Sequence, residues 1–498
     1  MPKQLAGQSA LLMAGNIFTL AVGFPFQIYI ARKLGPGDLG VFGLLDVGVQ
    51  TLCALFGLGL GQVAVRYIPE YVERSQTGAI RDLLKRVYGI GLGMSVLALI
   101  VINLLVPVLV SWKPEIRSYQ ALIPVMSIMI PVSMLVGISQ QVLRGFFDVR
   151  LIVIMSSFVQ LFLKVVLTIV FFSMDMQLSG YICAGIVSAA FCLLGMGIGI
   201  RKRMRRLKAD GSSSDAGMRS EWYQYGRVMY GNSLLGVAGP PLERFLLVGA
   251  MNISAVGALV VIRQLQNLPQ VFLQVIITVV SPMFVSSKGR DDTAMLYHLA
   301  TDWICRLALP LLLFLLIRTS DILELYGDGF AEIGTVALIV TILAQCVSLF
   351  AGPVGNLLNM KGKHSKMLRI NFVSVLVALI GCVVLVPVFG LMGVALVTAL
   401  SVSVAKFCAV AAAHRELSIG WWSSRFYKWL MPAAVTAALF LLMQVTFEGA
   451  SRWWMAGEFV AGFAVFHLVY FMGGICHEDR QVIAAIADRF STRKSSIG

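Results

Sequence analysis

The segment Leu34-Gly-Pro-Gly-Asp-Leu-Gly-Val-Phe-Gly43 lies between two long apolar stretches, which cover residues 8–30 and 41–65. A helix needs about 20 apolar residues to cross the hydrocarbon core of a bilayer. Both stretches meet that length, and a segment rich in glycine and proline is typical of a connecting loop. This part of the sequence therefore predicts two transmembrane helices joined by a short loop.

The same pattern continues along the chain. Of its 498 residues, 58% are hydrophobic and only 13% are charged, whereas soluble domains carry about 25% charged residues. The first span is too long for the apolar core of a signal peptide, so we expect it to remain as an anchor. We predict an all-α polytopic membrane protein with fourteen spans and no soluble domain of useful size. The spans are expected at 8–30, 41–65, 87–111, 120–143, 151–174, 178–200, 228–250, 256–285, 303–318, 333–358, 367–388, 390–413, 429–447 and 456–475.

Basic residues predict the orientation, because cytoplasmic loops are enriched in Lys and Arg. With the N-terminus inside, 29 of the 40 basic residues fall in inner segments and six in outer loops. This places both termini in the cytoplasm of a bacterium, with the chain in its inner membrane. The net charge of +15 is then mostly a topology signal. The basic run at 201–206 is interpreted as a stop-transfer anchor that also contacts anionic lipid, in preference to a nucleic-acid site.

An internal repeat organises the chain. The segment Leu34–Gly43 has a counterpart in Met251-Asn-Ile-Ser-Ala-Val-Gly-Ala-Leu-Val260, and aligning Gly40 with Gly257 gives an offset of 217 residues. Later landmarks match at offsets of 215 and 213. Six spans return the chain to the same side, so the two halves are expected to be parallel. The predicted domains are a first six-helix lobe at 1–200, a basic cytoplasmic linker at 201–225, a second lobe at 226–413, and two extra helices with a tail at 414–498.

Prolines occur at matching places in the two halves. Pro25 lies in the first span, and Pro240 and Pro241 lie in the seventh. Proline removes a backbone hydrogen bond and kinks a helix. In transporters built from repeats, substrate sites lie at the repeat interface on helices interrupted in this way. These prolines are therefore predicted hinges, with a simple packing kink as the alternative.

Polar residues inside the spans predict a cavity. In the eighth span, polar residues from Arg263 onward recur on one helical face, which must face the bundle interior or a water-filled cavity. The repeat offset carries Asp46 onto Arg263, so equivalent positions hold opposite charges. The predicted substrate-binding residues are Gln27, Asp46, Lys164, Glu243, Arg244, Arg263, Gln266, Asn267 and Gln270. The alternative is a set of structural ion pairs, for instance Glu243 with Arg263.

Three segments resemble a known family. They are Ala31-Arg-Lys-Leu-Gly-Pro-Gly-Asp-Leu-Gly-Val-Phe-Gly43, Gly59-Leu-Gly-Gln-Val-Ala-Val-Arg-Tyr-Ile-Pro-Glu70 and Leu357-Leu-Asn-Met-Lys-Gly-Lys363. They resemble the polysaccharide-transport (Wzx-type) flippase branch of the multidrug/oligosaccharidyl-lipid/polysaccharide (MOP) exporter superfamily, whose length and fourteen spans also match. The resemblance implies a flippase, not an enzyme, that moves an undecaprenyl-diphosphate-linked oligosaccharide to the outer leaflet by alternating access. Its product would serve cell-surface polysaccharide such as the O-antigen of lipopolysaccharide.

Other functions stay open. The chain could export drugs or the peptidoglycan precursor lipid within the same superfamily, although fourteen spans differ from the usual twelve of drug exporters. A membrane polymerase or ligase would need a large outer loop with catalytic groups, and no such loop is evident. There is no Walker motif, which leaves coupling to H⁺ or Na⁺ through Asp46 or Glu243 open. We expect no cofactor, no resident metal ion and no nucleic-acid partner.

Reporter fusions test the predicted topology. A reporter fused at Lys208 or at the C-terminus is expected to be active in the cytoplasm, and one fused at Asp328 is expected to be active outside. The measurement is the activity of paired reporters that each work on only one side of the membrane. An external signal at Lys208 would contradict both the number of spans in the first half and the repeat derived from it.

Overall fold

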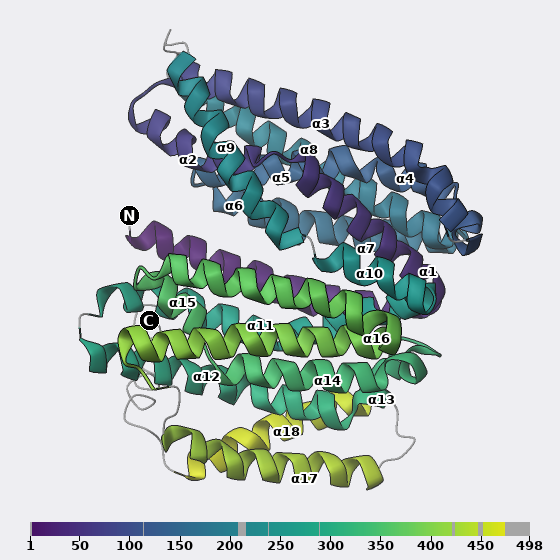
Figure 1. Cartoon of the computed structure of the whole chain (residues 1–498), viewed down its shortest axis with the longest axis vertical. Helices are drawn as coiled ribbons and strands as arrows, with labels where there is room; N and C mark the ends of the chain where they lie inside the picture. The colour runs from purple at the N-terminus through teal and green to yellow at the C-terminus, as the bar shows by residue number, and fades with distance from the viewer. Residues whose placement is uncertain are drawn as a thin grey trace, which may run out of the picture. The chain divides into compact units, whose positions relative to one another are not determined.

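The computed structural model describes residues 2–112, 114–207, 216–237, 239–287, 289–420, 424–446 and 452–473. Lys208 and the C-terminal tail, where two of the reporters are placed, lie outside these residues. All regular secondary structure in the described part of the chain is helical, which confirms the predicted fold class (Figure 1). The elements are α1 (Pro2–Phe56), α2 (Leu60–Glu73), α3 (Thr77–Trp112), η1 (Pro114–Tyr119), α4 (Leu122–Ser127), α5 (Met129–Gly145), α6 (Val149–Ile152), the π-helix η2 (Val153–Gln160), α7 (Leu161–Ser173), α8 (Gln177–Arg206), α9 (Ala216–Val237), α10 (Gly239–Ala250), α11 (Ile253–Ser286), α12 (Arg290–Ile317), α13 (Thr319–Glu324), α14 (Phe330–Phe350), α15 (Val354–Met360), α16 (His364–Leu417), η3 (Ser424–Trp429), α17 (Leu430–Thr446) and α18 (Arg452–Met472).

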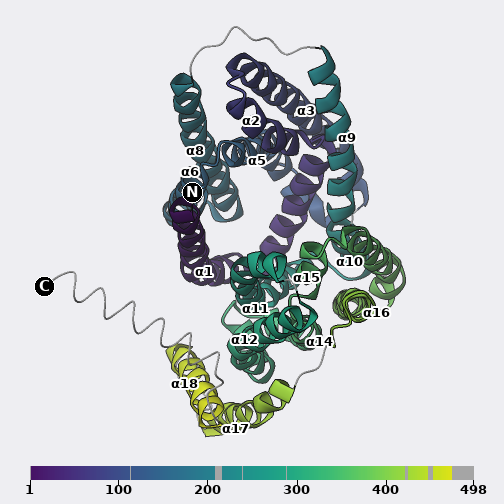
Figure 2. The same cartoon turned by 90° about the vertical axis from the view of Figure 1, so that its left-hand side faces the viewer.

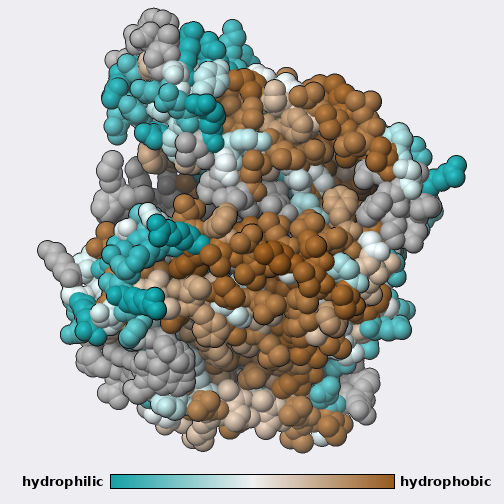
Figure 3. Space-filling view, viewed as in Figure 1, coloured by the Kyte–Doolittle hydropathy of each residue, from teal (hydrophilic) through white to brown (hydrophobic). Residues whose placement is uncertain are grey.

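Most helices follow the predicted membrane spans. Ten stretches of described helix are long and apolar enough to cross a bilayer. Among the described residues, the predicted spans at 228–250 and 256–285, which fall on α9, α10 and α11, are not in this set. Two of the ten stretches, within α1 and α16, are broken at a glycine with a left-handed backbone, so that each contains two consecutive spans. These glycines are Gly35 (φ 71°) and Gly390 (φ 56°). Exposed helix flanks carry hydrophobic side chains, and hydrophilic residues gather toward helix ends (Figure 3). The chain is therefore a multi-pass membrane protein.

The described chain divides into two compact units. Unit 1 comprises residues 1–263, 323–334 and 375–397, and unit 2 comprises residues 264–322, 335–374 and 398–498. The units are defined by spatial proximity, so their bounds differ from those of the predicted lobes at 1–200 and 226–413. Those lobes remain a prediction.

The core of unit 1 is a bundle in which α5 packs against α2, α3 and α8 (Figure 2). Small residues allow this close packing: a side chain at Gly145 would meet the backbone carbonyl of Ala64 in α2. Asp148 caps the N-terminus of α6 by accepting a hydrogen bond from the backbone N–H of Leu151, which satisfies a donor that the helix leaves free.

The predicted helix over 41–65 is wrong at its C-terminal end. α1 ends at Phe56, the backbone turns through Leu58 and Gly59 with positive φ, and α2 begins at Leu60. Gly59 is required because a Cβ there would lie 2.6 Å from the carbonyl oxygen of Gly226 in α9. The apolar run hides this break, since α2 buries one face against unit 1 and so remains hydrophobic past the end of α1.

The glycines that the predicted repeat aligns make a reciprocal contact inside unit 1. A Cβ on Gly40 would lie 2.0 Å from the carbonyl oxygen of Ile253, and a Cβ on Gly257 would lie 2.0 Å from that of Pro36. Both pairs are related by the same offset of 217 residues, which makes the two contacts equivalent under exchange of the halves. This reciprocity supports the internal repeat that the sequence predicts.

In unit 2, α17 and α18 pack against α12 (Figure 1). Two buried polar clusters join these helices. At one end of α12, Arg318 donates to both carboxylate oxygens of Glu458 in α18, at 2.8–3.2 Å. Toward the other end, the indole of Trp429 donates to Asp302 at 2.7 Å, and Asp302 also pairs with Arg306 at 2.8 Å. Specific polar contacts thus tie α12 to α18 and to η3, the segment that leads into α17.

The reciprocal glycines predict a packing defect. Gly40→Ala and Gly257→Ala are each expected to lower the free energy of unfolding by roughly 1–3 kcal/mol, because the added methyl overlaps a backbone carbonyl. Gly48→Ala is the matched control, since it lies in the same helix with nothing within 4 Å of its Cβ. Thermal unfolding in detergent measures the effect. Equal stability of Gly40→Ala and the control would contradict the close contact.

The Arg318–Glu458 pair makes a separate prediction for unit 2. Glu458→Met is expected to cost about 3–5 kcal/mol, because it leaves a buried arginine short of a partner. Arg318→Met/Glu458→Met is expected to recover most of that loss, because an apolar pair of similar size can replace a buried ion pair. Thermal unfolding in detergent gives the comparison, and a double variant no more stable than Glu458→Met would count against this role.

Candidate functional site

Two of the predicted charged residues form an ion pair within unit 1. The guanidinium of Arg263 in α11 donates to Oε2 of Glu243 in α10 at 2.6 Å. The side chain of Glu243 is 12% exposed and that of Arg263 is 30% exposed. This is the pairing that the sequence offered as the structural alternative. It joins α10 to α11, and the guanidinium compensates the charge of the largely buried carboxylate.

Arg244, the next residue of α10, points to a different partner. Its guanidinium donates a hydrogen bond to the backbone carbonyl of Gly43 in α1. It also interacts electrostatically with Asp46, which lies about one helical turn further along α1. Asp46 accepts a hydrogen bond from the amide of Gln50 at 2.7 Å. Arg244 and Asp46 therefore face each other, with Arg244 fixed by a neutral carbonyl.

Lys164 in α7 is held by aromatic groups. Its ammonium donates to the hydroxyl of Tyr181 at 3.1 Å and lies 4.4 Å from the centroid of that ring. The ring of Phe42 is 5.9 Å away. Lys164 also interacts electrostatically with Asp46. Its direct partners are thus uncharged, and cation–π contact stabilises the ammonium without neutralising it.

A π-helix precedes Lys164. The wider turns of η2 run over eight residues and lead directly into α7. Such π segments are rare and often mark functional sites. Because the π geometry rotates all later residues around the helix axis, it determines the face on which Lys164 lies.

The prolines occupy different places from those predicted for a matched pair of kinks. Pro25 lies within α1, whose only non-helical residue is Gly35. Pro240 and Pro241 lie in the first turn of α10, where a missing N–H leaves no intrahelical bond unmade. The seventh span consists of two helices, α9 and α10, with residue 238 between them outside the described residues. The hinge role of these prolines stays a prediction.

The remaining predicted residues carry amides. Gln27 is half-buried in the first arm of α1. The other three lie on the part of α11 that belongs to unit 2, where Gln266 is buried, Asn267 is exposed, and Gln270 donates to Gln345 of α14. The structure therefore gathers the charged residues in unit 1 and assigns these three amides to unit 2.

Sequence reasoning missed the groups that hold the cations. In the sequence, Tyr181 lies near the start of the span in α8 and resembles an ordinary interfacial aromatic residue. Phe42 resembles a lipid-facing one. Their role follows from the packing of α7 and α8 and the second arm of α1, where the two rings lie 4.7 Å apart. The carbonyl of Gly43 has no sequence signal at all. Taken together, the five charged residues predicted for the site all lie in unit 1. They are three cations and two carboxylates, a net charge of one positive that suits an anion.

Comparisons with known proteins agree with this architecture. The family model described as polysaccharide biosynthesis protein matches residues 5–288, which is more than half of the chain. No curated protein matches the sequence. Among solved structures, the chain is similar to the lipid II flippase MurJ in an inward closed conformation, with a TM-score of 0.73 and 12% identity over 93% of this chain and 98% of that one.

Two MATE transporters share the fold. An inward-facing multidrug resistance MATE family transporter of the MOP superfamily has a TM-score of 0.61 and 14% identity over 80% of this chain and 94% of that one. The Vibrio cholerae MATE transporter VcmN in its bent form has a TM-score of 0.54 and 16% identity over 84% of this chain and 97% of that one. The predicted resemblance is confirmed: this chain belongs to the polysaccharide biosynthesis protein family and has the fold of MOP superfamily transporters.

Proposed function

We propose that the protein is a flippase for a lipid-linked oligosaccharide, which carries an undecaprenyl-diphosphate headgroup from the inner to the outer leaflet of a bacterial inner membrane. The family match and the transporter fold support a flippase. The observation that carries the choice of an anionic headgroup is the excess of cations among the predicted charged residues of unit 1. Lys164 and Arg244 make their direct hydrogen bonds to uncharged groups.

A diphosphate that crosses the bilayer needs cations along its path. The hydrocarbon cannot solvate its charge, and burial of an unpaired charge is prohibitive. Arg binds phosphate oxygens through two parallel hydrogen bonds, and Lys binds them as a point charge. In this proposal Arg244 and Lys164 bind the diphosphate. When no substrate is bound, both cations interact electrostatically with Asp46 instead.

Arg263 has a different role in the proposal. Because Glu243 already accepts its hydrogen bond, Arg263 positions α10 and keeps Arg244 directed at α1. Gln27 supplies neutral hydrogen bonds for sugar hydroxyls. A proton or Na⁺ gradient that acts through Asp46 or Glu243 is the energy source that we propose.

Export of a peptidoglycan precursor lipid is the second candidate function. The similarity to a lipid II flippase over nearly the whole chain favours it over drug export. A cationic site in the spans would serve either lipid substrate, so the glycan that is lost in a deletion strain distinguishes them. Loss of surface polysaccharide with an intact cell wall favours the first function.

Removal of the two cations tests the proposed site. Lys164→Ala and Arg244→Ala are each expected to reduce surface glycan about tenfold or more, since a hydrogen bond to a charged group contributes about 1.5–3 kcal/mol. Arg244→Lys is expected to retain part of the activity, because the charge remains while the planar fork is lost. Arg201→Ala, an exposed arginine of α8, is the control. Surface glycan and protein abundance in the membrane are measured together.

The ion pair gives the contrasting result. Arg263→Ala is expected to lower the abundance of the protein itself, and Glu243→Gln in the same chain is expected to restore it. Normal glycan display with both Lys164→Ala and Arg244→Ala would refute the diphosphate site. Loss of display by Arg263→Ala at full protein abundance would show that Arg263 binds substrate as well.

A further inference from the structure

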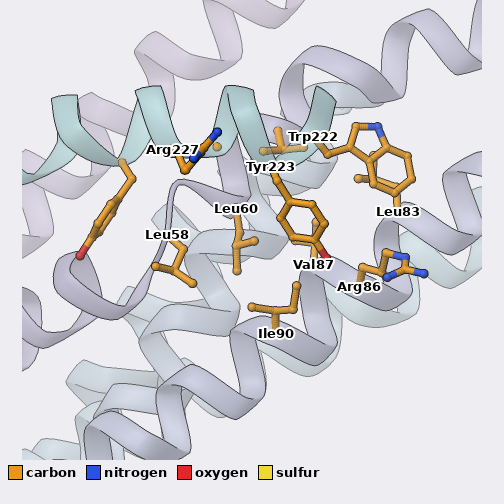
Figure 4. Close-up of a pocket in the computed structure, with 12 residues that line it drawn as sticks. Leu58, Leu60, Leu83, Arg86, Val87, Ile90, Trp222, Tyr223 and Arg227 are labelled. Carbon is orange, nitrogen blue, oxygen red and sulfur yellow. The ribbon is translucent and has the colours of Figure 1, made fainter. Parts of the chain in front are cut away.

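A pocket of about 190 Å³ lies within unit 1, away from the charged cluster (Figure 4). Its walls come from α2, α3 and α9, and from the turn that precedes α2. Half of its lining residues are aliphatic: Leu58, Leu60, Val63, Leu83, Val87 and Ile90. The volume is below the range of about 300–1,000 Å³ that is typical of sites for whole small molecules. It suits a segment of an apolar chain better than a headgroup or a sugar.

The pocket is a built feature, because α9 is fixed to α2 and α1 beside it. The indole of Trp222 in α9 donates to the hydroxyl of Tyr71 in α2 at 2.8 Å. Further along α9, the hydroxyl of Tyr230 donates to the carbonyl of Leu55 in α1 at 2.7 Å. Both Trp222 and Tyr230 also line the pocket. Its walls are therefore held in place by hydrogen bonds on both sides.

Two arginines line the same pocket. Arg86 of α3 interacts with Asp82 and with the hydroxyl of Tyr223. Asp82 also pairs with Arg219 at 3.3 Å, so two arginines share one carboxylate. Arg227 of α9 is exposed, and no ion pair joins it to another residue in the described part of the chain. The lining thus combines an apolar wall with a net positive charge, which indicates an anionic amphiphile.

The surface beyond the pocket continues its apolar character. Leu97 and Leu104 follow Ile90 at seven and fourteen residues along α3, so they share its helical face, and they are 43% and 72% exposed. This stripe extends about 20 Å along the helix, compared with roughly 15 Å for one leaflet of the hydrocarbon core. The arginines lie at the end where α3 begins, together with the hydrophilic residues over α2 and the start of α9 (Figure 3).

We propose that this pocket and stripe bind an anionic phospholipid of the cytoplasmic leaflet. The phosphate contacts Arg86 and Arg227, the first part of one acyl chain enters the pocket against Trp222 and Ile90, and the rest follows α3. An arginine near an anionic membrane surface contributes about as much as a lysine to lipid binding, and the bidentate fork of arginine adds geometric preference for phosphate. This site is separate from the substrate cluster, and it does not depend on the proposed function.

The test uses the full chain, purified in detergent and titrated with phosphatidylglycerol or phosphatidylcholine, with native mass spectrometry as the readout. Wild type is expected to retain phosphatidylglycerol and not phosphatidylcholine. Arg86→Gln/Arg227→Gln is expected to weaken phosphatidylglycerol binding roughly thirtyfold, which corresponds to about 1 kcal/mol for each arginine. In this variant Asp82 still forms its ion pair with Arg219, so the fold is expected to persist. Arg81→Gln, an exposed arginine of α3 outside the pocket, is the matched control and is expected to bind as wild type does.

A second readout examines the acyl chain. Phosphatidylglycerol with brominated chains quenches tryptophan on contact, and the contribution of Trp222 is the difference between wild type and Trp222→Phe. Ile90→Phe, which fills the pocket, is expected to remove that quenching while leaving the other tryptophans quenched. Equal binding of the two phospholipids, unchanged binding in the double arginine variant, or quenching of Trp222 that persists in Ile90→Phe would each overturn the proposal. Retention of undecaprenyl phosphate in preference to phosphatidylglycerol would also overturn it, and would assign the pocket to the substrate path.

Discussion

The close approach of two backbone turns, at Pro36–Gly40 and Ile253–Gly257, is the contact on which the rest of unit 1 depends. Each turn presents a glycine to the carbonyl of the other, at a distance that no side chain would permit. Within one helical turn of this contact lie Gly43 and Val260, which are also equivalent under the repeat and also touch. The carbonyl of Gly43 then accepts the hydrogen bond of Arg244. The contact that joins the repeats therefore also positions the charged cluster.

Charges within membrane spans require partners, and this chain supplies two kinds. Arg318 and Glu458 are both buried and pair directly, and Arg318 also donates to Asp321. Their contribution is to attach α18. Lys164 and Arg244 instead make direct hydrogen bonds to neutral oxygens, which orients each cation and leaves its charge uncompensated by direct contact. The first arrangement suits a fixed helix contact, and the second suits a site that accepts an anion.

The two features proposed for lipid lie in different parts of unit 1. The charged cluster involves α1, α7, α10 and the start of α11, while the pocket involves α2, α3 and α9. The charged cluster combines cations with aromatic rings and carboxylates. The pocket combines two arginines with an aliphatic wall near the start of α3. A phospholipid that binds the pocket would stabilise the packing of α9 on α2 and α3, next to the helix boundary that leads into α10 and Arg244.

Composition and periodicity were sufficient for the fold class, because in hydrocarbon a helix satisfies every backbone hydrogen bond within one segment. The predicted repeat also aligned Gly40 with Gly257, and these two glycines lie in reciprocal contacts. The break at Gly57–Gly59 could not be predicted, since α2 is buried against the bundle and stays apolar. The sequence also left open which charged residues pair, because Glu243 and Arg244 are neighbours in the chain. Only the tertiary packing pairs Glu243 with Arg263 and directs Arg244 at α1. The aromatic groups around Lys164 and the pocket beside Trp222 arise from residues far apart in the chain, so they exist only once the helices have packed.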